Sequence, residues 1–347
     1  MTLRLLLGLA LSVVVACTGD IGPGGDDDGG STDPVTLAFT TPTVGAAFVR
    51  DTIEPSNGWR AAAVDVELAI TGAPATIELS AGDAAATVAL GAIDVATGRG
   101  QAMLIESGAV TLTAIAKDGA GATLATATVD VTVGEPQVAN CRGWLDLYGA
   151  SYTVGPANQG VADPVTIMTP INGMQFRYLG NANVRPMFFM DCSLARSLLE
   201  AAAHLRSQGV VEVTDIGVYN YRCIGGGTPP NCANGISQHA YAKAIDIAGF
   251  TDADGVYYSV NDDWVIDPTT EKTCEAATSN ELDAFLHQMI CQLKAAKVWN
   301  IVLTPNYNDA HRNHFHVDLT TGSDFIRKPG AVAVEDLVDV DSGPDLH

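Results

Sequence analysis

Residues 35–136 show a regular alternation of apolar and polar positions. The clearest runs are 64–70, 110–116 and 129–133, and turn signals such as Asp118-Gly119 separate the runs. Because successive side chains of a strand point to opposite faces, a period of two is typical of strands with one buried face. Several short strands at this spacing predict an all-β sandwich of roughly one hundred residues.

The pattern changes after residue 136, and residues 141–328 mix helical and strand periods. One helix is predicted to start near Asp191 and to stop at Gly209, and a second is predicted to start at a Ser279 cap. The strand candidates are residues 210–219, 244–250, 301–303 and 314–319. Helices and strands mixed without a regular βαβ alternation predict an α+β domain.

The two ends of the chain differ from these two regions. Residues 1–17 combine a positive start with an apolar run too short to cross a bilayer, which is typical of an export signal. The run ends in Ala16-Cys17 and resembles a lipobox, so Cys17 is expected to carry lipid; an ordinary cleaved signal is the alternative. The Gly/Asp-rich segment 18–34 is expected to be a linker, and residues 329–347 an acidic tail. We therefore expect an exported protein, lipid-anchored in the cell envelope at the outer membrane or periplasm.

Charge and cysteine content narrow the partners. Forty acidic residues oppose 18 basic ones, and the formal net charge of −22 argues against a nucleic-acid partner, since phosphate binding needs a basic surface. Six of the seven cysteines lie beyond residue 140. In an oxidising compartment they can form up to three disulfides, and the sequence leaves the pairing open. A cysteine metal site is the competing interpretation, but the chain has no Cys-x-x-Cys pair.

Two stretches, 237–248 and 308–318, carry the candidate chemistry. If 314–319 is a strand, His314, His316 and Asp318 share one face. Asp246 stands between two isoleucines in a run that is typical of a buried strand, seven residues after His239. A buried carboxylate needs a partner, and two imidazoles with a carboxylate suit zinc. A hydrogen-bonded structural role is the alternative for any one histidine.

These residues form a recognisable signature. Ser-x-His-x6-Asp followed by His-x-His resembles the zinc motifs of the superfamily that contains lysostaphin, D-Ala-D-Ala carboxypeptidases and the hedgehog signalling domain. The resemblance is most specific to the bacterial extensin-like C-terminal domain family, and the pattern from Tyr307 to His316 is also similar to murein endopeptidases. Residues 35–136 resemble Ig-like modules in general pattern only. The expected architecture is an α+β metallopeptidase-like C-terminal domain preceded by an all-β Ig-like sandwich.

The resemblance implies a role for each matching residue. It implies that His239, Asp246 and His316 hold zinc, with His314 and His311 as further active-site histidines. The glutamate that serves as base in the carboxypeptidases is replaced by Asn313, so His314 takes that role. The glycine usual in the first motif is replaced by Ala242.

Two further side chains complete the predicted site. Arg222 is a candidate for holding a substrate carboxylate, and an exposed strand-end arginine is its alternative interpretation. Ser237 is a candidate donor that orients a metal ligand.

The predicted function is a zinc-dependent peptidase that acts on peptidoglycan cross-links. The alternative is a cell-wall or glycan-binding module in which the zinc is structural. A third possibility is an adhesin whose β-sandwich carries the function.

Overall fold

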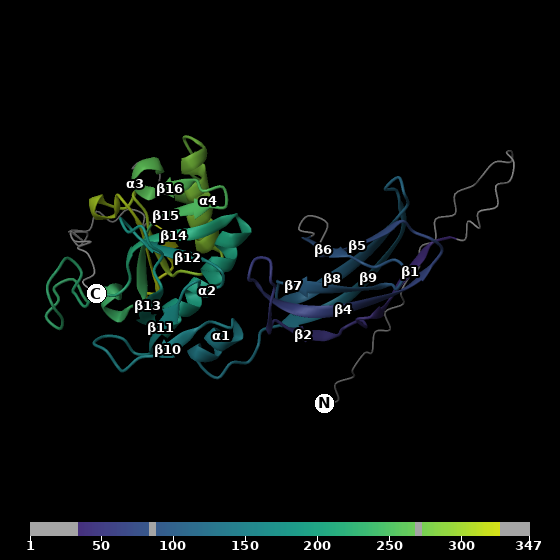
Figure 1. The fold of residues 1–347 in the computed structure, drawn as a ribbon, viewed down its shortest axis with the longest axis horizontal. Helices are drawn as coiled ribbons and strands as arrows, with labels where there is room; N and C mark the ends of the chain where they lie inside the picture. The colour runs from purple at the N-terminus through teal and green to yellow at the C-terminus, as the bar shows by residue number, and fades with distance from the viewer. Residues whose placement is uncertain (1–33, 83–87, 268–272, 327–347) are drawn as a thin grey trace, which may run out of the picture.

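The computed structural model describes residues 34–82, 88–267 and 273–326. These residues form two lobes, an N-terminal sandwich and a C-terminal domain (Figure 1). The predicted signal peptide with Cys17, the linker up to residue 33 and the acidic tail 329–347 lie outside the described residues. Among the described helices, none has the length and apolar character needed to span a membrane.

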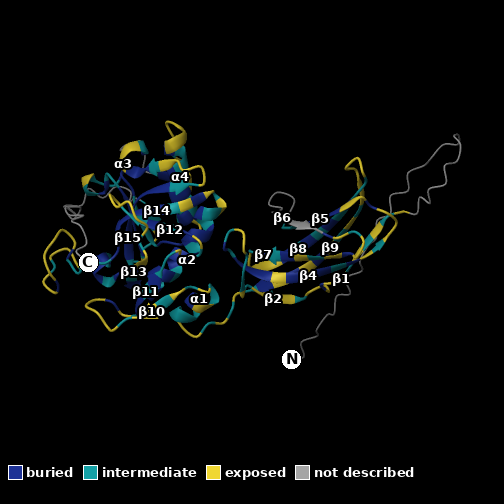
Figure 2. Cartoon of the chain, viewed as in Figure 1, coloured by how far each residue is buried: buried dark blue, intermediate teal, exposed yellow. Residues whose placement is uncertain are grey.

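The N-terminal lobe is a sandwich of two β-sheets. Within the described residues, one sheet has the order β1 (Thr36–Thr41), β4 (Arg60–Thr71), β3 (Thr52–Ile53), with β7 (Arg99–Leu104) also on β4. The other has the order β2 (Ala47–Val49), β9 (Thr123–Gly134), β8 (Gly108–Lys117), β5 (Thr76–Ala81), β6 (Val88–Ala92). Val64, Val66 and Leu68 are buried between the sheets while Asp65 and Ala69 are exposed, so the predicted alternation is confirmed (Figure 2).

The C-terminal lobe is built on a mixed sheet. Within the described residues, its order is β12 (Gln175–Tyr178), β14 (Val210–Gly217), β15 (Ala244–Asp252), β18 (Phe315–Asp318), β17 (Ile301–Leu303), β19 (Phe325–Ile326), with β16 (Tyr257–Ser259) also on β15. A smaller antiparallel sheet joins β10 (Tyr152–Val154), β11 (Pro164–Met168) and β13 (Met187–Asp191). The two central strands β15 and β18 are the ones that carry the candidate site.

The helices of the same lobe supply the rest of the core. They are α1 (Cys141–Leu147), α2 (Cys192–Ser207), α3 (Val260–Asp263) and α4 (Glu281–Ala295), with 3₁₀ turns η1 (Gln238–Tyr241), η2 (Thr273–Glu275) and η3 (Asp309–His311). Helix α2 begins as predicted, because the Asp191 carboxylate accepts the backbone N–H of Ser193. The apolar face of this helix is buried in the core, and it consists of Leu194, Leu198, Ala202 and Leu205. The mixture of helices and strands is the α+β arrangement expected.

The predicted start of the second helix is wrong by one residue. The N-cap of α4 is Asn280, whose side-chain oxygen accepts the backbone N–H groups of Leu282 and Asp283 at 3.0 Å. Ser279 lies one position earlier and donates its backbone N–H to the Asp283 carboxylate. The physical reason is geometric: an amide oxygen at position 280 reaches two of the unpaired N–H groups of the first turn.

All six cysteines beyond residue 140 are paired, which confirms the expected disulfides. Cys141–Cys192 joins α1 to α2, and Cys274–Cys291 joins η2 to α4. Cys223–Cys232 closes a surface loop that precedes the candidate site.

The two lobes touch through aromatic and arginine side chains. The Trp144 ring of α1 has the Arg60 guanidinium of the sandwich 4.6 Å from its centroid and the Arg196 guanidinium of α2 at 4.3 Å. Arg206 of α2 donates to the backbone oxygen of Ser56 at 2.7 Å. The contact therefore holds the sandwich against the helices of the C-terminal lobe.

Candidate metal centre

Three polar side chains converge at the middle of the C-terminal sheet. Asp246 on β15 and His316 on β18 are directly opposite each other in the antiparallel register. His239 lies on η1, the turn that immediately precedes β15. The neighbours Ile245 and Val317 are fully buried in the core, which fixes both strands and holds the polar side chains in place.

The distances among the three side chains fit a tetrahedral ion. His239 Nε2 lies 3.2 Å from both Asp246 Oδ1 and His316 Nδ1, and the last two atoms are 2.9 Å apart. Two ligands bonded to zinc at about 2.0–2.1 Å with a tetrahedral angle are about 3.3 Å apart. The three atoms therefore can lie on one face of a tetrahedral coordination sphere, and the group can hold a metal ion.

Both imidazoles are oriented by an acceptor on the far side of the ring. His239 Nδ1 lies 2.8 Å from the backbone oxygen of Val218, and His316 Nε2 lies 3.0 Å from Asp318 Oδ2. A carbonyl or carboxylate oxygen can only accept a hydrogen bond, so the ring nitrogen beside it carries the hydrogen. In a neutral ring the other nitrogen then has a free lone pair, and that nitrogen faces the cluster. The sequence placed Asp318 on the face of His316 but missed this role.

Two further histidines surround the cluster. His314 Nε2 lies 3.5 Å from Asp246 Oδ1, and its Nδ1 lies 2.8 Å from Asn313 Oδ1. His311 stands on η3, with its Nδ1 2.6 Å from Asn308 Oδ1 and its ring centroid 5.2 Å from that of His314. Each ring is thus held by the amide of a nearby asparagine. His311 and His314 are only 4% and 5% exposed, so the centre lies below the surface.

The histidines and carboxylates of the cluster shift one another's pKa values. Burial opposes the charged form of His316, but hydrogen bonds to Asp246 and Asp318 outweigh it and raise the pKa of the imidazole to about 10. Burial likewise opposes ionisation of Asp246, yet the neighbouring His239 and His314 hold the pKa of its carboxyl well below the usual value. The three converging atoms therefore favour a positive charge among them, which a metal ion or a proton can supply.

The remaining predicted residues lie on the approach to His239. Ser237 is buried and is the N-cap of η1: its hydroxyl accepts the backbone N–H of His239 at 3.3 Å. In this contact the Ser237 hydroxyl is an acceptor, and it orients the turn that carries His239 through the backbone N–H of that residue. The backbone oxygen of Arg222 accepts the N–H of Ser237 at 3.2 Å, which places Arg222 beside the turn.

The alanine in the first motif adopts an unusual backbone conformation. Ala242 ends η1 with φ of 52° and ψ of 36°, in the left-handed region that favours glycine. Its backbone oxygen accepts the N–H of Asp191, and its N–H donates to His239. A glycine is therefore the natural residue for this turn, and here alanine takes the same conformation at some cost in strain.

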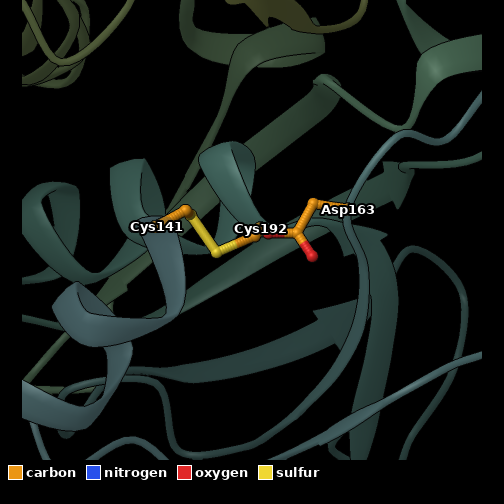
Figure 3. A group of neighbouring side chains, drawn as sticks. All are labelled: Cys141, Asp163 and Cys192. Atoms are coloured by element: carbon orange, nitrogen blue, oxygen red, sulfur yellow. A yellow bond between two sulfur atoms is a disulfide. The ribbon is translucent and has the colours of Figure 1, made fainter. Parts of the chain in front are cut away.

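A second cluster of possible ligands has a different explanation. Cys141, Asp163 and Cys192 lie close together (Figure 3). Both sulfurs belong to one disulfide, and the Asp163 carboxylate pairs with Arg142. Disulfide sulfur has no thiolate to offer a metal, so this group is structural.

Comparisons with known proteins found one family match and several matches to solved structures. Residues 155–327 match the family model described as extensin-like protein C-terminus. No curated protein matches the chain. Among solved structures, fibronectin(III)-like modules of Clostridium thermocellum CbhA match at 12% identity and a TM-score of 0.23, covering 29% of this chain and 99% of theirs. Parabacteroides merdae β-glucuronidase matches at 9% identity and a TM-score of 0.21, covering 40% of this chain and 16% of that enzyme.

Proposed function

From the extensin-like match of residues 155–327, we propose that the C-terminal lobe is a zinc-dependent peptidase acting on peptidoglycan cross-links. The observation that carries the proposal is the convergence of His239, Asp246 and His316 within 3.2 Å of one another. A catalytic zinc site has three protein ligands and keeps a fourth position for water or substrate. Two more imidazoles beside such a position supply acid–base groups.

Each side chain has a role in the proposed hydrolysis. A zinc ion held by His239, Asp246 and His316 would supply an activated water and a Lewis acid for the scissile carbonyl. His314 takes a proton from the attacking water through Nε2 and returns it to the leaving amine, since Asn313 Oδ1 accepts the Nδ1–H and so directs Nε2 toward the cluster. In its protonated form, His311 donates to the developing oxyanion. Arg222 pairs with a carboxylate of the peptide.

The proposed location is consistent with this substrate. An exported chain anchored through a lipid on Cys17 faces the cell envelope, where peptidoglycan is the abundant cross-linked peptide. Residues 18–34, the predicted linker, then connect this anchor to the folded lobes.

A wall-binding module with structural zinc is the second candidate. The observation that favours it is Asn313, which stands where the carboxypeptidases of the resembling superfamily have a catalytic glutamate. An amide cannot accept a proton in the pH range of hydrolysis. In this case the same three ligands stabilise the fold and the protein binds the wall without cutting it.

The deciding experiment combines metal content with peptide release. We expect about one zinc per chain by mass spectrometry, and release of peptides from purified cross-linked muropeptides that stops on removal of the metal by EDTA and returns with zinc. His239→Ala should lose the metal, whereas His314→Ala should keep it and lose at least about a hundredfold in rate. Cleavage by metal-free protein would refute the peptidase mechanism, and zinc binding without any cleavage would favour the binding module.

A further inference from the structure

A disulfide-closed finger projects from the base of the candidate metal centre. We define the disulfide finger as residues 223–236. Its stem is closed by the Cys223–Cys232 disulfide, by the antiparallel bridge between Cys223 and Ile236, and by the hydrogen bond from Ile224 N–H to the Gly235 oxygen at 3.0 Å. The segment extends away from the lobe as a mostly exposed loop (Figures 1 and 2).

Both ends of the finger run directly into the metal centre. On the entry side, the backbone oxygen of Val218, five residues before Cys223, lies 2.8 Å from His239 Nδ1. On the exit side, Ser237 follows the finger at once and caps the turn that carries His239. The stem of the finger therefore lies beside the candidate metal centre, while its exposed residues extend away from the lobe.

The loop of residues 155–163 lies on the other side of the turn that carries His239. A Cβ on Gly160 would lie 2.2 Å from the Ala240 oxygen and 3.3 Å from the Tyr221 ring, so the 155–163 loop packs tightly against the metal-bearing turn. Tyr219 donates its hydroxyl to the Gln159 oxygen and makes an edge contact with Phe189 at 5.2 Å. Aromatic side chains thus line the base of the finger on the side of this loop.

The chemistry of the finger is unusual for this chain. The chain carries a net charge of −22, yet no charged residue occurs in residues 223–236. The exposed residues between Ile224 and Gly235 offer amide and hydroxyl groups of Asn and Thr and backbone groups of glycine. Such groups match the hydroxyl and acetamido groups of a neutral saccharide, and aromatic faces at the base suit sugar rings.

We propose that the disulfide finger binds the saccharide backbone of the polymer whose peptides the metal centre cuts. The choice of peptidoglycan as this polymer rests on the proposed function. The disulfide holds the loop in one shape, which lowers the entropy lost on binding a long chain. Neutral contacts also avoid the repulsion that a strongly acidic protein would have with carboxylates of the peptide. The finger would place the saccharide and leave the peptide free to enter the centre.

The test uses the full chain and glycan strands from which the stem peptides have been enzymatically removed. We expect the intact protein to co-sediment with these strands, and Asn231→Ala/Asn234→Ala to weaken binding about tenfold, the equivalent of one or two lost hydrogen bonds. Cys223→Ser/Cys232→Ser should weaken binding similarly. Asn183→Ala, an exposed asparagine of the same lobe outside the finger, should bind as the unaltered protein does. Zinc content of each variant reports that the metal centre is intact.

The outcomes separate this proposal from the peptidase. Glycan binding that is unchanged in both finger variants, or absent in the intact protein, would overturn the finger proposal whatever the activity. Finger-dependent glycan binding without peptide release would support the finger and refute the peptidase. Loss of glycan binding together with loss of zinc in the asparagine variant would also count against the proposal, because the effect would then come from the centre itself.

Discussion

At the scale of single residues, the environment of His316 sets the properties of the centre. Its Nδ1 meets Asp246 at 2.9 Å and its Nε2 meets Asp318 at 3.0 Å. Asp318 is itself buried and accepts the backbone N–H of Thr320 at 2.8 Å, so it is fixed in position. Such a carboxylate fixes the orientation of the ring and raises the basicity of Nδ1, the nitrogen that faces Asp246.

Replacing this carboxylate should weaken metal binding without removing a ligand. We expect Asp318→Asn to lower zinc affinity by about 10–100-fold, because the amide is neutral and a weaker acceptor for the ring N–H. A chelator competition titration measures the change. Asp65→Asn, at an exposed carboxylate of the sandwich that bonds Gln101, is the matched control and should leave affinity unaltered. Equal affinities for the Asp318 variant and the control would contradict the assignment of Asp318.

The raised pKa of His316 predicts the pH dependence of metal uptake. With a pKa of about 10, the ring is protonated at neutral pH in the metal-free protein, so zinc must displace a proton. Apparent affinity should therefore rise at least about tenfold per pH unit as pH increases toward 10, and fall as pH decreases. Calorimetry in buffers of different ionisation heat should give about one proton released per zinc bound near pH 7. Uptake without proton release would show that His316 is already neutral.

Sequence patterns could locate the candidate ligands but not the groups that orient them. The spacing of Asp246 between isoleucines and of His316 two residues after His314 placed these residues on buried strands, and the strands do pair. The acceptor for His239 is the backbone oxygen of Val218, which any residue could provide. Every residue has a backbone oxygen, so the sequence does not show which one orients His239. Only the folded structure identifies Val218 as that acceptor.

At the scale of elements, the start of α4 shows that residue type alone does not decide which of two adjacent residues caps a helix. Ser279 and Asn280 are both good capping residues, and the sequence alone favoured the first. In the structure Asn280 has the extended backbone of a cap, with φ of −159° and ψ of 177°, and accepts two N–H groups. The period of the apolar positions predicted the helix, but the choice between adjacent caps depended on the path of the preceding loop.

The two capping candidates should differ in their contribution to stability. We expect Asn280→Ala to cost about 1 kcal/mol, since two N–H groups lose their acceptor. In a domain of this size that lowers the thermal midpoint by about 2–4 °C. Ser279→Ala leaves its backbone N–H to Asp283 intact and should change stability by less than about 0.5 kcal/mol. Thermal unfolding followed by circular dichroism compares them, and a larger loss for Ser279→Ala would contradict the cap assignment.

At the scale of the whole molecule, the two lobes were predicted separately and their contact was not. Apolar residues at every second position identified the sandwich, and a mixture of helical and strand spacings identified the α+β lobe. Such a spacing shows which side of a single helix or strand faces the core of its own lobe. The contact between the lobes relies on single side chains, and no period marks them. Gly58 shows how close the approach is: with φ of 79°, a Cβ there would lie 2.3 Å from Asn172 Oδ1. The Asn172 amide donates to the Gly58 oxygen at 2.9 Å in the same place.

This contact predicts that the lobes unfold together and that Trp144 joins them. Arg60 of the sandwich and Arg196 of α2 both stack on the Trp144 ring, and each such contact is worth about 0.5–1 kcal/mol at a partly exposed site. We expect Trp144→Ala to split the single calorimetric transition into two and to make the connection between Gly134 and Asn140 cleavable by protease. Arg99→Ala, which removes an exposed guanidinium paired with Glu67 on the sandwich, should do neither.

A single transition and unchanged protease resistance in the Trp144 variant would mean that the contacts of Gly58 and Arg206 hold the two lobes together without the Trp144 ring. Two transitions would mean that the cooperative unfolding of the sandwich with the C-terminal lobe depends on the Trp144 contacts to Arg60 and Arg196.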